Sequence, residues 1–193
     1  MDAWVRDNTL PPVSSYPKIS DGTLVSLEKY VFPAIPGVNK PHEANQAYRL
    51  DYGQDWRKGI LSIQPPIVGA AFPVLVPQVD ADGNELAGVR LPQVTVPLGT
   101  YTGWNLRDAS IGAPDQRIPF EGSYLAFPKT TAEQKKTGDP RKSIAERYAS
   151  REDYMKRYAK AVDELVRERW ILPEDRETML RQGEAEWALA TAK

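Results

Sequence analysis

Residues 72–107 read FPVLVPQVDADGNELAGVRLPQVTVPLGTYTGWNLR and form the one long apolar, strand-forming stretch of the chain. Two runs within it, Val74-Leu75-Val76 and Val94-Thr95-Val96, are rich in the β-branched residues that favour strands. Between them, residues 80–84 (DADGN) are of the types that tolerate a positive φ in a tight turn. The pattern therefore predicts a β-hairpin with these two runs as its strands.

Four prolines limit how these strands can pair. A proline lacks the backbone N–H that a strand ladder uses, so it is confined to short, bulged or edge strands. The four are Pro73, Pro77, Pro92 and Pro97. We expect a small sheet, which further short strands could join.

Two of those further strands are expected between residues 48 and 63. Residues 48–52 alternate apolar and polar side chains, as a half-buried strand does. Residues 59–63 could pair with them before Pro65 and Pro66 end the strand. A last apolar piece, residues 123–128, is expected to pack against the sheet.

The first eight residues have the pattern of a helix end, which the Leu10-Pro11 step terminates. No capping residue precedes this helix, and it carries Trp4, a residue type that is usually largely buried. We therefore expect the natural chain to continue upstream of Met1.

The composition changes near residue 129, since 15 of the 17 prolines precede it and the following segment is charged and helical in pattern. We expect residues 1–128 to form a Pro-rich strand and loop region with the hairpin 72–107 at its centre. Residues 129–193 are then a helical segment packed on that region, with one domain overall.

Two helix starts are marked by Ser143 with Glu146 three residues later, and by Ser150 with Asp153. The second helix carries an apolar stripe, and a further helix follows Pro173. The stripe residues are Tyr154, Tyr158, Ala161, Val162, Leu165 and Val166 on the first of the two helices, and Met179, Leu180, Gly183 and Trp187 on the second. The predicted fold is α+β, with a short antiparallel hairpin or meander followed by a C-terminal helical hairpin that packs on it.

Charge and composition exclude several classes of partner. The chain has 25 Lys and Arg against 26 Asp and Glu, and neither region carries the one-sided basic surface that nucleic acid or an anionic membrane needs. No run approaches the roughly 18 apolar residues of a membrane span, so a soluble protein is expected. The absence of cysteine excludes disulfides and thiolate chemistry and is compatible with any compartment.

The sequence lacks the usual motifs of hydrolytic nucleophiles and of metal-binding sites. No serine lies in a Gly-x-Ser-x-Gly nucleophile elbow. The one histidine, His42, is expected to be an exposed loop residue, and one histidine without cysteine disfavours zinc. Residues 80–91 do not fit a calcium loop, because Glu85 and Leu91 stand where that loop needs glycine and glutamate. No catalytic residue, metal site or cofactor is expected in this chain.

Residues 100–107 (TYTGWNLR) combine aromatic, amide and guanidinium groups. Tyr101 and Trp104 could supply the flat apolar walls of a ligand site, with Asn105 and Arg107 orienting a polar or anionic group. The alternative is a strand end whose aromatic side chains pack in the core while Asn105 and Arg107 satisfy backbone carbonyls. Such strand ends are common.

The order of several segments resembles the C-terminal part of a bacterial family of alpha/beta-hydrolase domain proteins. The resemblance covers essentially the whole chain and is carried by Trp4–Asp7, Pro11-Pro12, Tyr16-Pro17, Asp21–Val25, Arg49–Gly53, Pro73–Pro77, Asp80–Gly88, Thr100–Arg107 and Gly138–Arg141. It implies a larger parent enzyme that acts on ester or related acyl bonds, with its nucleophile and histidine upstream. This chain departs from the family pattern there, because it holds neither the elbow nor the histidine-bearing loop.

Two functional hypotheses follow. In the first, the chain is the C-terminal part of a hydrolase and lines its substrate cleft through Tyr101, Trp104, Asn105 and Arg107. Its partners are then the missing upstream core or a small-molecule substrate, and the chain alone is not catalytic. In the second, it is a free-standing ligand-binding or protein-interaction module without a large exposed apolar face, whereas a severed piece should expose Trp4 and associate.

Overall fold

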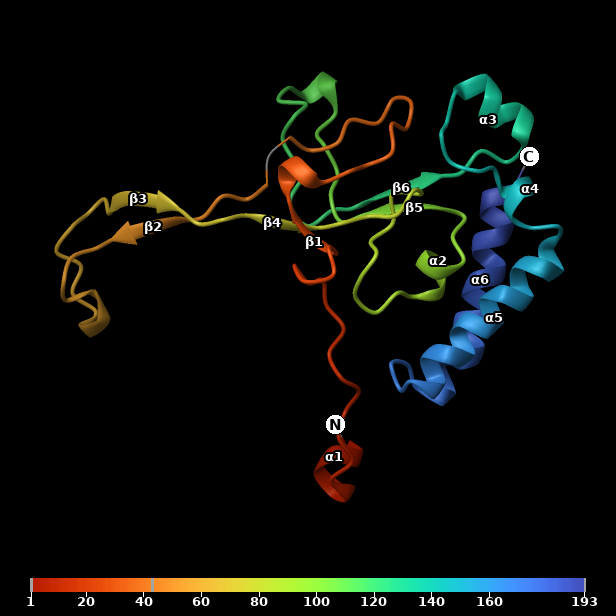
Figure 1. The fold of residues 1–193 in the computed structure, drawn as a ribbon, viewed down its shortest axis with the longest axis horizontal. Coiled ribbons are helices and arrows are strands. Elements are labelled where there is room, and N and C mark those ends of the chain that lie inside the picture. Colours follow the sequence, from red (N-terminus) through yellow and green to blue (C-terminus); the bar gives the residue numbers. More distant parts are fainter. Residues whose placement is uncertain (1, 43, 193) are drawn as a thin grey trace.

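Short antiparallel strand pairs followed by a helical hairpin make up the computed structural model, which describes residues 2–42 and 44–192 (Figure 1). The strand pairs are β1 (Leu24–Ser26) with β4 (Leu75–Pro77), β2 (Tyr48–Asp51) with β3 (Ile67–Ala71), and β5 (Gly99–Thr102) with β6 (Ser123–Ala126). Each sheet in this part of the chain has two strands, as the proline content leads one to expect. The predicted α+β class is confirmed.

The helices are mostly C-terminal. They are α1 (Asp2–Asp7), α2 (Pro92–Thr95), α3 (Thr131–Thr137), α4 (Ile144–Arg147), α5 (Arg151–Arg167) and α6 (Arg176–Thr191), with 3₁₀ turns at Leu27–Lys29, Trp56–Lys58, Ala109–Ile111 and Pro173–Asp175. Both predicted helix starts are confirmed. Ser143 and Glu146 form a capping box before α4, and the Ser150 hydroxyl accepts a bond from the Asp153 backbone N–H at the start of α5.

The predicted central hairpin is wrong in its second strand. β4 pairs with β1, with Val25 opposite Val76, whereas residues 92–95 form the helix α2. Pro92 occupies the first turn of this helix, where its fixed φ is favourable and its missing N–H costs nothing, and this outweighs the strand preference of Val94 and Thr95. The predicted turn is present: the Asp80 backbone N–H donates to the Asn84 carbonyl at 2.8 Å, and Val79 bridges to Glu85.

The predicted partner of residues 48–52 is also wrong. β2 pairs with β3, with Asp51 opposite Ile67, and residues 59–63 form no strand. Pro65 and Pro66 therefore precede the partner strand instead of ending it, which removes no ladder donor from the pair. Residues 123–126, by contrast, pair with β5 as β6, with Thr100 opposite Leu125.

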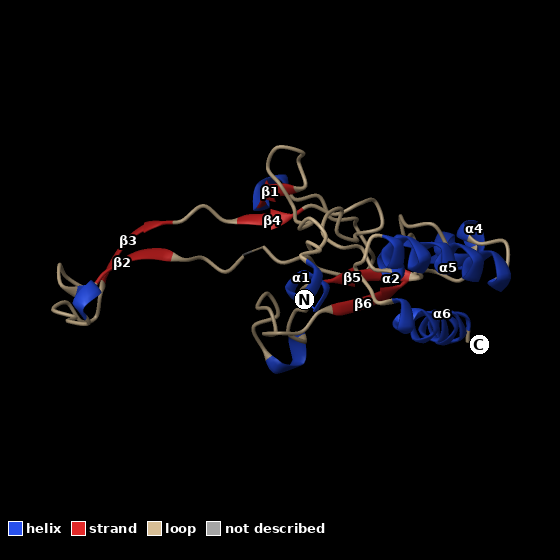
Figure 2. Ribbon diagram, turned by 90° about the horizontal axis from the view of Figure 1, so that it is seen from below, coloured by secondary structure: helices blue, strands red, loops and turns tan. Residues whose placement is uncertain are grey.

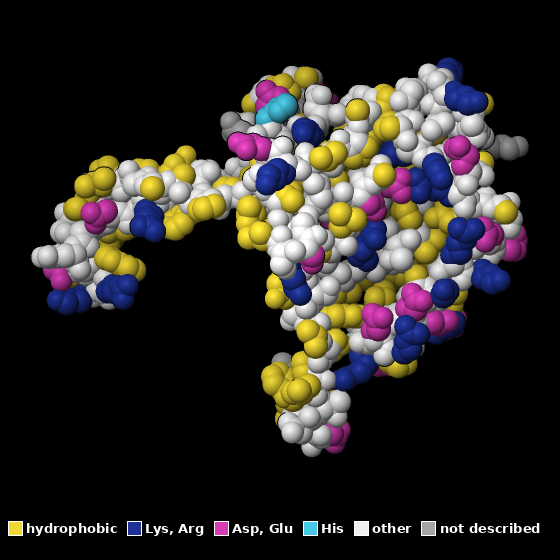
Figure 3. All heavy atoms as spheres, viewed as in Figure 1, with side chains coloured by type: hydrophobic (Ala, Val, Ile, Leu, Met, Phe, Trp, Pro, Cys, Tyr) yellow, Lys and Arg dark blue, Asp and Glu magenta, His cyan; other side chains and the backbone are white. Residues whose placement is uncertain are grey.

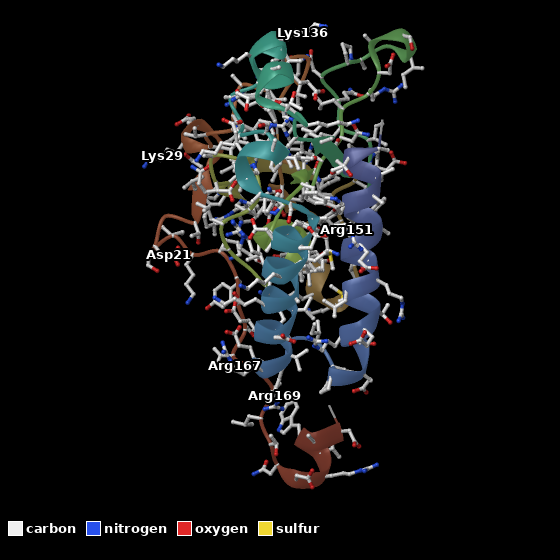
Figure 4. All side chains as sticks on the ribbon, turned by 90° about the vertical axis from the view of Figure 1, so that its right-hand side faces the viewer. Asp21, Lys29, Lys136, Arg151, Arg167 and Arg169 are labelled. Atoms are coloured by element: carbon white, nitrogen blue, oxygen red, sulfur yellow. The ribbon has the colours of Figure 1, made fainter. Side chains whose placement is uncertain are left out.

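The N-terminal helix is present, but it buries no residue. Trp4 is 45% exposed, so it does not have the buried environment that its residue type suggested. The chain then turns at Asn8, which has a positive φ of 55°. The Arg169 guanidinium, just beyond α5, donates to the Leu10 carbonyl at 2.9 Å and links this segment to the helices (Figure 4).

α5 and α6 run side by side and form the predicted helical hairpin (Figure 4). Tyr154, Tyr158 and Val162 on α5 are fully buried, as the stripe predicts. Gly183 on α6 permits the close approach, because a Cβ there would lie 2.7 Å from the Tyr158 ring. The hairpin shares its core with Leu98 and with other residues of the strand region and of the α4 segment. These core residues include Val96, Phe127, Ile144 and Tyr148.

A buried arginine joins the helical segment to the β5–β6 pair. Arg141 is only 3% exposed. Its guanidinium donates to the Thr100 hydroxyl at 2.9 Å on β5, and to the carbonyls of Leu125 and Ala126 at 2.8 and 3.0 Å on β6. The Asp139 carboxylate accepts two further bonds at 2.9 and 2.6 Å and balances the charge. Burial pushes the pKa of Asp139 upward, but the bonds and charge of Arg141 outweigh it and hold this pKa below its usual value.

One segment stands away from this core. We call residues 46–72 the arm; it comprises β2, the 3₁₀ turn at Trp56–Lys58 and β3, and it projects from the body (Figures 1 and 2). The Gln46 side-chain amide donates to the Phe72 carbonyl at 2.8 Å and closes the base of the arm. Every residue of β2 and β3 is exposed, and apolar side chains cover much of the arm (Figure 3).

The arm and the N-terminal segment enlarge the surface. The chain has 13,244 Å² of accessible surface for a mass of 21.6 kDa. A compact monomer of that mass exposes about 9,200 Å². The excess is about 4,000 Å².

Replacing Arg141 with alanine is expected to reduce the free energy of unfolding by about 3–5 kcal/mol, because Asp139 and two strand carbonyls lose a buried partner. The measurement is urea unfolding followed by circular dichroism. The matched control is Arg151→Ala, whose exposed bridge to Glu184 should contribute less than about 1 kcal/mol. Equal effects of the two substitutions would contradict the role assigned to Arg141.

Candidate functional site

A cavity of about 190 Å³ lies where the end of β5 meets the turn at residues 80–85. Its walls include the aromatic side chains of Tyr30, Tyr101 and Trp104 and the apolar side chain of Val76. Two charged residues, Glu85 and Arg117, also line it. The cavity is therefore mostly apolar with few polar groups, as small-molecule sites usually are.

Asn84 fixes the turn against β5. Its side chain is fully buried; the amide nitrogen donates to the Gly99 carbonyl at 3.2 Å, and the amide oxygen accepts from the Tyr101 backbone N–H at 2.8 Å. Gly83 is required beside it, because it has a φ of 83° and a Cβ there would lie 2.8 Å from the Thr100 methyl group. These contacts set the position of Glu85 relative to Tyr101.

The aromatic side chains that line the cavity pack against other aromatic rings. The Trp104 ring packs edge-on against Phe32, with centroids 5.3 Å apart, and Phe32 stacks on Tyr30 at 6.2 Å. Tyr101 packs against Tyr124 with centroids 5.0 Å apart. Such aromatic pairs add to the energy of burial and prefer defined geometries, so the walls present ordered faces to the cavity.

The two charged residues are held differently. Arg117 donates to the Asn45 side-chain oxygen. Glu85 forms no ion pair with any residue of segments 2–42 and 44–192. It is accessible to solvent at the rim of the cavity, and partial burial of its carboxyl raises its pKa above the usual value of a glutamate.

The four predicted site residues do not all lie together. Tyr101 and Trp104 line the cavity. The Arg107 guanidinium instead donates to the carbonyls of Gly112 and Ile111 at 3.1 and 3.3 Å, which is the packing role weighed as the alternative. The Asn105 carbonyl accepts from the Ile118 backbone N–H at 2.8 Å, and its side chain is not part of the cavity wall.

Sequence reasoning missed Tyr30, Glu85 and Arg117 as cavity residues. Glu85 directly follows the turn that was recognised, so its proximity to β5 was a readable signal. Tyr30 and Arg117 come from distant segments, and no local pattern brings them to the same place.

The described residues contain no assembled catalytic triad. His42 is exposed in its loop, and no serine hydroxyl in the described part of the chain is hydrogen-bonded to it. No group of three His, Asp or Glu side chains capable of holding a metal ion occurs among residues 2–42 and 44–192.

Glu186 on α6 is partly buried and lies near tyrosines of β5 and α5. This burial raises the pKa of its carboxyl despite the bond from the Gln182 amide at 3.0 Å. Burial, with the nearby charge of Glu186, also raises the pKa of Tyr101, Tyr154 and Tyr158. The buried hydroxyls of Tyr154 and Tyr158 have no hydrogen-bond partner within the described part of the chain.

Comparison with known proteins gives one decisive match. The family model described as "Alpha/beta hydrolase domain" matches residues 1–181. This chain belongs to the alpha/beta hydrolase domain family. The resemblance to this family is thus confirmed. No curated protein and no solved structure matches the chain. None of the helices in the described segments combines the length and the apolar character that a membrane crossing demands.

Replacing Glu186 with glutamine is expected to stabilise the family member at neutral pH. The raised pKa of Glu186 means that the folded state binds its proton more tightly than the unfolded state does. Its contribution is therefore most favourable below the unfolded value of 4.5 and is lost as the pH rises through the raised folded value. The two proteins should have similar unfolding free energies near pH 4 and diverge above it, as urea titrations at several pH values can measure. A gap that does not change with pH would contradict this assignment.

Proposed function

We propose that this chain forms one wall of the substrate cleft in a hydrolase of ester or related acyl bonds, and that the nucleophile is supplied by another part of the enzyme. The single observation that carries the proposal is the aromatic cavity of Tyr30, Tyr101 and Trp104 in a chain of the alpha/beta hydrolase family. Such a cavity fits the apolar portion of an acyl substrate.

The absence of a nucleophile elbow supports the second half of the proposal. An elbow serine needs glycines at both flanking positions, so that its hydroxyl projects from a sharp turn, and no serine of the sequence has them. A Ser-His-Asp mechanism also needs a histidine bonded to the nucleophile. His42 is the one histidine of the sequence, and it lies exposed in a loop.

The large exposed apolar surface supports a macromolecular partner. The chain exposes about 4,000 Å² more than a compact monomer of its mass, which is more than the roughly 1,000–2,500 Å² that each partner of an obligate interface buries. A two-stranded hairpin is at best marginally stable by itself in water, yet both strands of the arm are uncovered. We assign this surface to the nucleophile-bearing α/β core of the hydrolase.

The chain alone is expected to show no turnover of p-nitrophenyl esters above the buffer rate, and joining it to the nucleophile-bearing core of the hydrolase should give turnover. In the joined enzyme, Trp104→Ala should raise KM about tenfold with a smaller change in kcat, because it removes a cavity wall and no reacting group. The matched control is Trp170→Ala, since Trp170 does not line this cavity. Turnover by the chain alone that disappears in His42→Ala and in one Ser→Ala variant would contradict the proposal.

The isolated chain is expected to self-associate at micromolar concentrations, because the arm leaves apolar side chains in water. Ile67 and Val68 on β3 are 58% and 62% exposed. The double substitution Ile67→Lys and Val68→Glu should reduce association in sedimentation velocity experiments, whereas Lys156→Glu on the exposed face of α5 should not.

A wild-type chain that remains monomeric at every concentration would instead favour a free-standing ligand-binding or protein-interaction module. That alternative expects no large exposed apolar face, and the exposure of the arm and of Trp4 therefore favours the hydrolase proposal.

A further inference from the structure

The two charged residues of the cavity wall make different contacts. The Arg117 guanidinium donates a hydrogen bond to the neutral side-chain oxygen of Asn45. The Glu85 carboxylate has no cationic partner among the described residues and lies exposed at the rim of the mostly apolar cavity. Glu85 is therefore available to pair with a cation brought by a ligand.

The aromatic walls fit the same kind of ligand. The faces of tyrosine and tryptophan rings attract cations through their negative quadrupole, and cages of such rings recognise quaternary ammonium groups. Tyr30, Tyr101 and Trp104 all line the cavity that Glu85 borders.

We propose that this cavity is a binding site for an organic cation, namely an alkylated ammonium group held between Tyr30, Tyr101 and Trp104 and paired with the Glu85 carboxylate. This inference deepens the proposed function and rests on it in one respect: the substrate of the hydrolase is then an ester that carries an ammonium group. The binding itself does not depend on hydrolysis.

The dimensions of the cavity agree with a small headgroup. A volume of about 190 Å³ is below the roughly 300–1,000 Å³ of sites that enclose a drug-sized molecule. The backbone at Gly103 does not crowd the carboxylate, because even a Cβ there would lie 3.9 Å from Glu85 Oε1. The headgroup would occupy the cavity, and the rest of the ligand would extend out of it.

The test is isothermal titration calorimetry of the 193-residue chain with choline and with its uncharged carbon isostere, 3,3-dimethylbutan-1-ol. The two probes have the same shape and differ in charge. Choline is expected to bind at least fivefold more tightly than the isostere. Equal affinity of the two probes, or no binding of choline at millimolar concentration, would overturn the proposal.

Variants locate the site. Glu85→Gln is expected to weaken choline binding at least fivefold and leave the isostere unaffected, and Trp104→Leu should weaken the binding of both probes. The matched control is Glu174→Gln, an exposed glutamate in the turn before α6 that does not line the cavity. Thermal melting establishes that each variant is folded. A Glu85→Gln protein that is folded and binds choline as the wild type does would contradict the assignment.

The pH dependence of choline affinity is a second readout, and it can be measured on the wild-type protein. Choline affinity should fall as the pH is lowered through the raised pKa of Glu85, because protonation removes the negative charge. The affinity of Glu85→Gln should not vary over the same range. A wild-type affinity that is equally flat would refute the pairing with Glu85.

These experiments distinguish failure of the cation site from failure of the proposed hydrolase function. If choline does not bind but Trp104→Ala still raises KM for neutral esters in the joined enzyme, the cleft wall stands and the cation site fails. If choline binds but the joined enzyme hydrolyses no ester, the cation site stands and the hydrolase role fails.

Discussion

The fold depends on one buried guanidinium. Arg141 brings a positive charge into a site that is almost fully enclosed, and such a charge is tolerated only where it is neutralised and its donors are satisfied. Asp139, two residues earlier, provides the counter-charge, and acceptors on β5 and β6 take the remaining donors. These hydrogen bonds join the helical segment to the strand pair. Because each bond requires one particular acceptor, they fix the relative position of the two more specifically than apolar contacts would.

The same network extends to the cavity. The Thr100 hydroxyl that accepts from Arg141 also donates to the Asp82 carbonyl in the turn at residues 80–85. The Asp82 carboxylate in turn forms a two-bond ion pair with Arg147 on α4. The turn that carries Glu85 is therefore anchored to the helical segment as well as to β5. The cavity wall is thus fixed to the body of the structure, whereas the arm is uncovered.

The helices were predictable because their determinants are local. Capping residues, Pro173 and a stripe of three- and four-residue spacing act within a few turns, and they specified α4, α5 and α6 correctly. Strand pairing is set by distant segments, so the sequence predicted strands at residues 74–76 and 48–52 but not their partners β1 and β3. The strand predicted at residues 94–96 is wrong for a local reason: one proline in a favourable helical position outweighed three β-branched neighbours.

For the site, aromatic content identified Tyr101 and Trp104 correctly as cavity residues. Arg107 instead donates to carbonyls of its own loop, and Tyr30 comes from a segment that is distant in the sequence.

Native-state hydrogen exchange of the chain tests the central claim most directly, since it measures the opening free energy of each segment. The account predicts the slowest exchange in β5, β6, α5 and α6 around Arg141 and Tyr158, and exchange in β2 and β3 that is faster by orders of magnitude because nothing covers the arm. If the amides of the arm exchanged as slowly as those of β5 and α5, the division into an anchored body and an uncovered surface would be wrong.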